Sequence, residues 1–171
     1  MVRNSIKNFI VQDSEDDNDV LHRKLFDVNI RLFNDNKKYR KLILNMVNYT
    51  KKVAEKRFAD YTPAKGISGA NVGIPFNIIG FLNRNKKWEF LLNPKILAKS
   101  TTKDVVKSNC GSLLLETSIK VERHKWIQLK YYDLKGEKKL EYFEDRYGRT
   151  IQHEVDHNNG ILITNIKRRV L

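Results

Sequence analysis

Apolar side chains recur at three- and four-residue steps along residues 35–59, which is the period of an amphipathic helix. Asp35 or Asn36 can cap the first turn of such a helix. We therefore expect a long helix here, preceded by an irregular arm over residues 1–34. The expected core stripe consists of Tyr39, Leu42, Met46, Tyr49 and Val53, widened by Ile43, Val47 and Ala54.

After residue 75 the pattern changes to short apolar runs and two-residue alternation. Residues 78–81 and 88–92 flank a polar stretch rich in turn-forming residues, so we expect them to pair as a hairpin. Between residues 126 and 133, Ile127, Leu129 and Tyr131 alternate with other residues and share one face of a strand. Further short strands are expected at residues 113–115, 119–121 and 140–143.

The last strong pattern is again helical and covers residues 145–158. Tyr147, Ile151 and Val155 follow one another at four-residue steps, and Gly160 stands where a glycine commonly ends a helix. The expected fold class is α+β, with short antiparallel strands around this late helix and a long N-terminal helix. A length of 171 residues suits one domain with one sizeable core, so we expect residues 1–171 to form a single domain.

The late helix carries the sequence His153-Glu154-Val155-Asp156-His157. Residues four apart share a face of a helix, so both imidazoles can reach one metal ion. Glu154 is displaced around the helix and can act as a general base without ligating the metal. The HExxH spacing therefore predicts a metal site with His153 and His157 as ligands and Glu154 as the acid/base, while an exposed histidine pair on a surface helix is the structural alternative.

A third ligand has to come from upstream, because residues 158–171 contain no His, Cys, Asp or Glu. Cys110 is the only cysteine of the chain, and His124 and His22 are the other candidates. Without the helix motif, Cys110 would be read as a core residue beside a strand. With that motif, a thiolate ligand is the better account, and a Cys/His/His set suits Zn²⁺, Fe²⁺, Co²⁺ or Ni²⁺ rather than Mg²⁺ or Ca²⁺.

The chain is strongly basic, with a formal net charge of +13. Such a surface can serve nucleic acid, the ribosome or an anionic membrane, although scattered lysines also fit codon bias. The densest cluster is Lys167-Arg168-Arg169 near the end. A single cysteine excludes an internal disulfide, and neither a signal peptide nor a run of eighteen apolar residues is evident. We expect a cytoplasmic protein without membrane association.

Three motifs together resemble the peptide deformylase family. Cys-Gly-Ser at residues 110–112 and Gln-His-Glu-Val-Asp-His at residues 152–157 are similar to its Glu-Gly-Cys-Leu-Ser and Gln-His-Glu-hydrophobic-Asp-His motifs. Its third motif, Gly-x-Gly-hydrophobic-Ala-Ala-x-Gln, corresponds to Ala-Lys-Gly-Ile-Ser-Gly-Ala-Asn at residues 64–71. Leu-Asn-Pro at residues 92–94 and Val-Glu-Arg at residues 121–123 add to the resemblance, with the longer spacing of the Gram-positive-like branch.

The sequence departs from these motifs in several places. Ser108-Asn109 replaces Glu-Gly before the cysteine, and Gly111 replaces the leucine after it. Ser68-Gly69 replaces the double alanine, and Asn71 replaces a glutamine that is one methylene longer. The three metal ligands and Glu154 remain, so an active enzyme is expected. The changes concern stabilisation of the oxyanion and the fit of the substrate.

The resemblance implies hydrolysis of the N-formyl group from the N-terminal formylmethionine of nascent polypeptides, with release of formate. It implies one divalent ion, Fe²⁺ by family preference, although Zn²⁺, Ni²⁺ or Co²⁺ also suit the ligands. Asn71 and the backbone N–H of Gly111 would stabilise the oxyanion. Gly66, Ile67 and Asn109 would line the substrate cleft. The partner would be the formylmethionyl nascent peptide, with the basic surface and the tail Lys167-Arg168-Arg169 near the ribosome.

Three alternatives remain open from the sequence. An HExxH peptidase is disfavoured because it needs a ligand downstream of His157. A catalytically weakened, deformylase-like protein that binds nascent or formylated N-termini is suggested by the changes at Ser108, Gly111 and Asn71. A basic RNA-binding domain with an accidental motif lacks an evident stacking motif or basic recognition helix.

Overall fold

The computed structural model describes residues 20–58, 65–110 and 118–167 of the chain. Among the expected features, the strand at residues 113–115, most of the N-terminal arm, Gly111, and Arg168 and Arg169 of the basic tail lie outside these residues. The elements in chain order are η1 (Val20–His22), α2 (Ile30–Asp35), α3 (Lys37–Arg57), β1 (Gly66–Ser68), η2 (Ala70–Val72), β2 (Ile78–Leu82), β3 (Trp88–Lys99), β4 (Lys103–Ser108), β5 (Ile119–His124), β6 (Trp126–Tyr132), β7 (Lys138–Glu144), α4 (Asp145–Asn158) and α5 (Ile163–Lys167).

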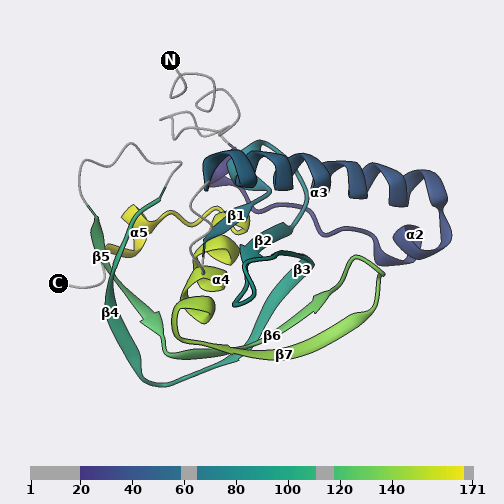
Figure 1. The fold of residues 1–171 in the computed structure, drawn as a ribbon. Helices are drawn as coiled ribbons and strands as arrows, with labels where there is room; N and C mark the ends of the chain where they lie inside the picture. Colours follow the sequence, from purple (N-terminus) through teal and green to yellow (C-terminus); the bar gives the residue numbers. More distant parts are fainter. Residues whose placement is uncertain (1–19, 59–64, 111–117, 168–171) are drawn as a thin grey trace, which may run out of the picture.

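The strands form two antiparallel sheets, and α4 lies between them (Figure 1). The larger sheet has the order β1-β2-β3-β6-β7, and the smaller one pairs β4 with β5. Helix α4 contacts β1, β2, β6 and β7 of the larger sheet and β5 of the smaller one. The expected α+β class with a late central helix and a long N-terminal helix is confirmed.

The expected strands that fall within the described residues are present, and two others, β1 and β4, were missed. The hairpin forms as predicted, with Ile78 opposite Leu92 and Leu82 opposite Trp88. The predicted inner face of β6 is confirmed, because Ile127, Leu129 and Tyr131 are buried. β3 continues beyond the predicted end to Lys99. β1 was missed because it has only three residues, and β4 because its exposed positions alternate with half-buried ones rather than with core residues.

The N-terminal helices differ in detail from the expectation. Residues 20–34 are not wholly irregular, because Asn29 caps the short helix α2 by accepting from the N–H of Leu32 at 3.0 Å. Asn36 caps α3, as one of the two predicted candidates. Within the described residues no helix is long and apolar enough to cross a membrane.

The predicted core stripe of α3 is partly wrong. Leu42 and Tyr49 are 47% and 39% exposed. Apolar side chains cover a wider part of the circumference of α3 than the face that is buried. The pattern alone therefore predicted a buried stripe that is rotated away from the observed buried face. Thr50 belongs to the buried face because its hydroxyl donates to the carbonyl of Met46 at 2.9 Å and so needs no solvent. The side chains that α3 buries are Ile43, Val47, Thr50, Val53 and Ala54.

Helix α4 begins and ends where the sequence predicted. Ile151 and Val155 are buried, so the helix is a core element rather than a surface one. Its end is a Schellman motif, in which the N–H of Gly160 donates to the carbonyl of His157 at 3.0 Å and the N–H of Ile161 to that of Asp156 at 2.9 Å. Gly160 has φ +71°, so glycine suits this position.

Buried polar side chains fix α4 to both sheets. Gln152 accepts from the backbone N–H of His124 at 3.0 Å and donates to its carbonyl at 2.9 Å. Arg123, also from β5, forms an ion pair with Asp156. On the other side, Asn158 donates to the carbonyl of Ile78 in β2 at 3.1 Å. The helix therefore has a defined position and rotation relative to both sheets.

We expect Gln152→Leu to lower the free energy of unfolding by about 2–4 kcal/mol, because it leaves buried backbone groups of His124 without partners. Urea unfolding followed by circular dichroism measures the effect. The matched control is Gln128→Leu on β6, a half-buried side chain for which the described residues offer no hydrogen bond. An equal effect of both substitutions would contradict the proposed role of the Gln152 bridge.

Candidate metal centre and active site

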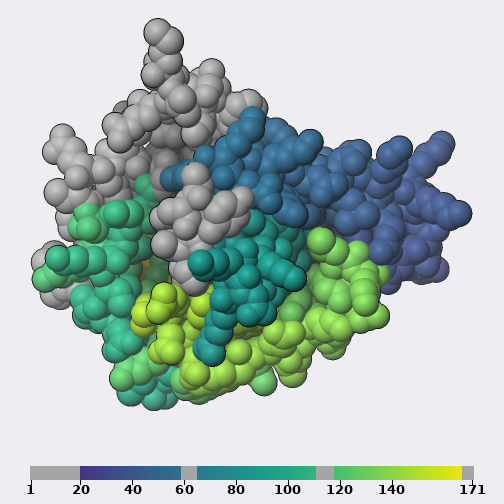
Figure 2. Space-filling view, viewed as in Figure 1, coloured from purple at the N-terminus to yellow at the C-terminus, as the bar shows by residue number. Residues whose placement is uncertain are grey.

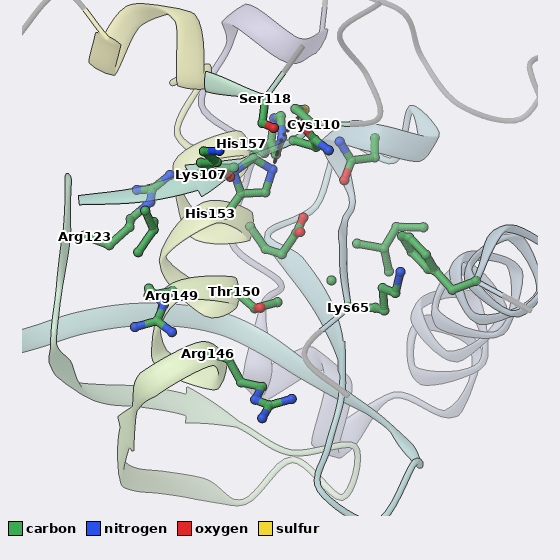
Figure 3. A pocket seen from close by; sticks show the side chains of 18 of the residues that line it. Lys65, Lys107, Cys110, Ser118, Arg123, Arg146, Arg149, Thr150, His153 and His157 are labelled. Atoms are coloured by element: carbon green, nitrogen blue, oxygen red, sulfur yellow. Dashed lines mark hydrogen bonds between the residues drawn. The ribbon is translucent and has the colours of Figure 1, made fainter. Parts of the chain in front are cut away.

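Cys110, His153 and His157 place three ligand atoms together (Figure 3). The Cys110 Sγ lies 3.1 Å from the His157 Nε2, and the two histidine Nε2 atoms lie 3.2 Å apart. All three ligand atoms lie within 4.8 Å of one another. Bonds of about 2.3 Å to sulfur and about 2.0 Å to nitrogen put the ligands of one tetrahedral ion roughly 3–4 Å apart. The donor set therefore fits a single divalent ion.

The fold explains which upstream residue joins the histidine pair. Cys110 is buried two residues after the end of β4, where the smaller sheet faces α4. His124 instead directs its Nδ1 to the carbonyl of Ser100 at 2.6 Å, and its backbone binds Gln152. His22 lies in η1 and is not part of the group. Among the described residues, the third donor is therefore Cys110 rather than either alternative histidine.

Burial keeps both imidazoles in the form that binds metals. It lowers the pKa of His157 to about 4 and the pKa of His153 well below its usual range. Nearby Arg123 and Arg57 act in the same direction, because a positive charge disfavours a second one. Neutral imidazole is the ligand form of histidine, so little proton release opposes metal binding here.

Glu154 is also buried, with 3% of its surface exposed. Burial raises the pKa of its carboxyl group to about 8, while Arg57 and Arg123 pull that pKa down. Its Oε2 has no hydrogen-bond partner within the described part of the chain. A Cβ on Gly66 would overlap the Oε1 of Glu154, so only glycine lets β1 lie this close to the carboxyl group.

The amide of Asn71 is held by Ser68. The backbone N–H of Ser68 donates to Asn71 Oδ1 at 2.8 Å, and the Ser68 hydroxyl donates to the same atom at 2.9 Å. Asn71 is buried in η2 and lines the same cavity as Glu154. Since Oδ1 is bound to Ser68, the Nδ2 donor is the end of the amide directed away from Ser68.

A cavity of about 880 Å³ surrounds these residues. Gly66, Ile67 and Asn109 line it together with Cys110, His153, Glu154 and His157, and their predicted contact with a substrate stays a prediction. Gly111 lies outside the described residues, so its expected place beside the metal ligands stays a prediction. In the space-filling view of Figure 2, atoms of the start of α4 (yellow-green) lie at the surface between the teal atoms of β2 and β3 and the green atoms of β4 and β5.

Several residues of the cavity were not predicted as part of the site. Arg146, Arg149 and Thr150 lie one and two turns before His153 on α4. The helical period could have found Arg146 and Thr150, because they precede His153 and Glu154 at steps of three and four residues. Arg57 was missed because only the tertiary structure brings it to the cavity wall. Ser68 lies three residues before Asn71 and was missed because its hydrogen bonds depend on the local turn of the chain, which no clear pattern in the sequence indicates.

Comparison with known proteins gives a consistent result. A family model described as polypeptide deformylase matches residues 10–170. The peptide deformylase of Pseudothermotoga lettingae is 31% identical over 105 residues, or 61% of this chain and 60% of its own length. The peptide deformylase of Afipia carboxidovorans is 34% identical over 104 residues, which cover 58% of this chain and 60% of that protein. These two sequence matches thus span about three fifths of each relative.

The fold match extends further along the chain. The class I type b peptide deformylase of Acinetobacter baumannii, solved with actinonin bound, has a TM-score of 0.75 at 26% identity. The match covers 92% of this chain and 96% of that one. The same enzyme with Met-Ala-Ser bound has a TM-score of 0.73 at 25% identity, covering 92% and 96%. The Gram-positive-like branch suggested by the motif spacing stays a prediction.

We expect the purified protein to bind one divalent metal ion per chain. Cys110→Ser and His153→Ala should each weaken metal binding by at least tenfold. Cys110→Ser replaces the thiolate with a poorer donor, and His153→Ala leaves only two of the three donors. Elemental analysis gives the stoichiometry, and Co²⁺ absorption reports a cysteine ligand through its thiolate charge-transfer band. His124→Ala is the control and should retain the ion. Equal metal content in all variants would exclude the triad as the binding site.

Proposed function

The chain belongs to the peptide deformylase family, and we propose that it hydrolyses the N-formyl group from the N-terminal formylmethionine of nascent polypeptides and releases formate. The observation that supports this best is the convergence of Cys110, His153 and His157 beside the buried Glu154. Each of these residues matches a motif position of the family. A similar fold with Met-Ala-Ser bound in the Acinetobacter baumannii enzyme supports a peptide as the substrate.

In this proposal, Cys110, His153 and His157 hold one divalent ion. The ion, when bound, lowers the pKa of water so that hydroxide is available near neutral pH. Fe²⁺ is our choice from the family, and the donor set also accepts Zn²⁺, Ni²⁺ or Co²⁺. A thiolate ligand next to ferrous iron makes the protein sensitive to oxidation.

Glu154 is the general acid and base. It takes the proton of the attacking water and later gives a proton to the leaving amine. A carboxyl group whose pKa is raised by burial toward neutrality is suited to both steps, since it can hold and release a proton near physiological pH. Contact with Gly66 on one side and α4 on the other limits the movement of the carboxyl group.

Asn71 and the backbone N–H of Gly111 stabilise the oxyanion that forms on the formyl group. Asn71 replaces a longer glutamine, and its bonds to Ser68 hold the amide in one orientation. In that orientation Nδ2 is directed away from Ser68 and would donate to the oxyanion. Gly66, Ile67 and Asn109 contact the substrate along the cleft, where an extended peptide can add to the edge of a strand.

The substrate leaves the ribosome, so we place the reaction in the cytoplasm. The basic surface and the tail Lys167-Arg168-Arg169 would favour contact with ribosomal RNA through its phosphates. No membrane is part of the proposal.

A second candidate is a catalytically weakened relative that binds nascent or formylated N-termini without turnover. The shorter Asn71, tied to Ser68, is the observation that favours it. This candidate requires the same cleft and metal, and differs only in the rate of formate release.

Formate release from formyl-Met-Ala-Ser tests the proposal. Protein purified without oxygen and loaded with Fe²⁺ or Ni²⁺ should release formate, and Glu154→Ala should lower kcat at least a hundredfold by removing the acid and base. Thermal unfolding and metal content confirm that the variant is folded and loaded. Tight peptide binding without formate from the wild type would support the binding protein instead.

The Ser68 hydroxyl should support catalysis through Asn71. We expect Asn71→Ala to lower kcat about a hundredfold, as for loss of an oxyanion donor. Ser68→Ala should lower kcat about five- to tenfold with little change in KM, because the amide loses one of the bonds that orient it. In the Asn71→Ala background the serine change should have no further effect.

The control restores the pair of residue types that the family carries. Ser68→Ala combined with Asn71→Gln should recover most of the activity lost by Ser68→Ala alone. If Ser68→Ala lowers kcat by the same factor in the wild type and in the Asn71→Ala background, the hydroxyl acts independently of the amide.

A further inference from the structure

The face of α4 that carries the histidine ligands continues toward the start of the helix. His157, His153, Thr150 and Arg146 follow one another at steps of three and four residues and line one cavity. Arg146 lies about 10 Å along the helix from His153, since each residue advances by about 1.5 Å. Figure 3 shows this row on α4, with Lys65 across the cavity from it. The cavity therefore has two parts, the metal centre and a region along α4.

The second part of the cavity is strongly cationic. Among the described residues that line the whole cavity, Glu154 is the one acidic side chain. The six cationic side chains are Arg57, Lys65, Lys107, Arg123, Arg146 and Arg149. Apolar surface is limited to Phe58, Ile67 and Val106, besides Cys110. A neutral peptide would supply no counter-charge to those cations that lack an acidic partner in the protein.

The cations differ in what already balances them. Arg123 is paired with Asp156, and Arg149 shares Asp104 at 3.5 Å with Lys125. Arg57 and Lys65 each lie 5.3 Å from the ring centre of Phe58, which balances charge weakly.

Arg146 and Lys107 have neither an ion pair nor a cation–π contact within the described part of the chain. For Arg146 and Lys107, no described carboxylate lies within ion-pair distance. Arg146 extends from α4 on the side of the cavity where Lys65 lies (Figure 3). Arg146 is therefore the cation best placed to bind an anionic group of a molecule in the cavity.

We propose that the part of the cavity along α4, formed by Arg146, Arg149 and Thr150, is a subsite for a carboxylate carried by the substrate within two residues of its formyl group. This proposal rests on the proposed deformylase function and changes its substrate class from formylmethionyl peptides alone to formylated peptides with an acidic residue at the first or second position. An extended peptide advances by about 3.3 Å per residue, and a glutamate side chain adds several ångströms. A carboxylate on the first or second residue therefore reaches Arg146 while the formyl carbon lies beside Glu154.

Peptide series test the subsite directly. We expect kcat/KM at low salt to be about tenfold higher for formyl-Glu-Ala-Ser or formyl-Met-Glu-Ser than for formyl-Met-Ala-Ser, as for one charge-assisted hydrogen bond. Formyl-Met-Lys-Ser should be poorer than the neutral peptide. The preference should shrink as salt is added, because the region is partly open to solvent.

The variants separate this subsite from the general positive charge of the protein. Arg146→Ala should abolish most of the preference for acidic peptides, measured in the same variant as the ratio of kcat/KM for formyl-Met-Glu-Ser to kcat/KM for formyl-Met-Ala-Ser. Arg31→Ala on α2 removes a side chain that is 91% exposed and does not line the cavity, so it should leave the preference unchanged. Inhibition by the product peptide Met-Glu-Ser gives a second readout that does not depend on turnover of that peptide.

The outcomes distinguish the two proposals. Formate from every peptide at similar rates, or an acidic preference that survives Arg146→Ala, overturns the subsite and leaves the deformylase function intact. A folded, metal-loaded protein that releases no formate from any of the peptides overturns the deformylase function. In that case, Arg146-dependent binding of Met-Glu-Ser would still support the subsite, and its absence would remove it.

Discussion

The placement of α4 between two sheets is the constraint on which the rest of the structure depends. A helix with this many polar residues can be buried only if those residues find partners inside the protein. Gln152 satisfies two backbone groups of β5, Asp156 pairs with Arg123, and Asn158 binds β2. These contacts fix the rotation of the helix, so that His153, Glu154 and His157 face the cavity.

The same burial determines the chemistry of the site. Removal from water makes the charged forms of His153, His157 and Glu154 unfavourable, which leaves two neutral imidazoles and a carboxyl group whose pKa is about 8. The fold thus prepares ligands and acid/base together, through one physical effect. Gly66 is part of this arrangement, because a side chain there would displace the carboxyl group from its place against β1.

The sequence predicted best what depends on local spacing. The bounds of α4, its buried face and the positions of the two histidines follow from a helical period within fourteen residues. Cys110 could be chosen because few other donors exist in the chain, and the structure brings it to the histidines. The buried face of α3 and the strand β4 were less predictable. Their apolar and polar residues are mixed on more than one face, so contacts with the rest of the fold decide which face is buried. The bond between Ser68 and Asn71 depends on the local turn of the chain between them, three residues apart. The cationic wall of the cavity depends on side-chain orientation across several elements, which the order of residues does not specify.

The metal donors come from two separate parts of the fold, Cys110 from the end of the smaller sheet and the histidines from the central helix. An ion bound by all three is therefore also a cross-link, which closes the long loop of chain between Cys110 and His153 as a disulfide would. Its loss removes this tie between the smaller sheet and the helix. In a chain that binds such an ion, metal supply would therefore also affect how long the folded chain survives proteases.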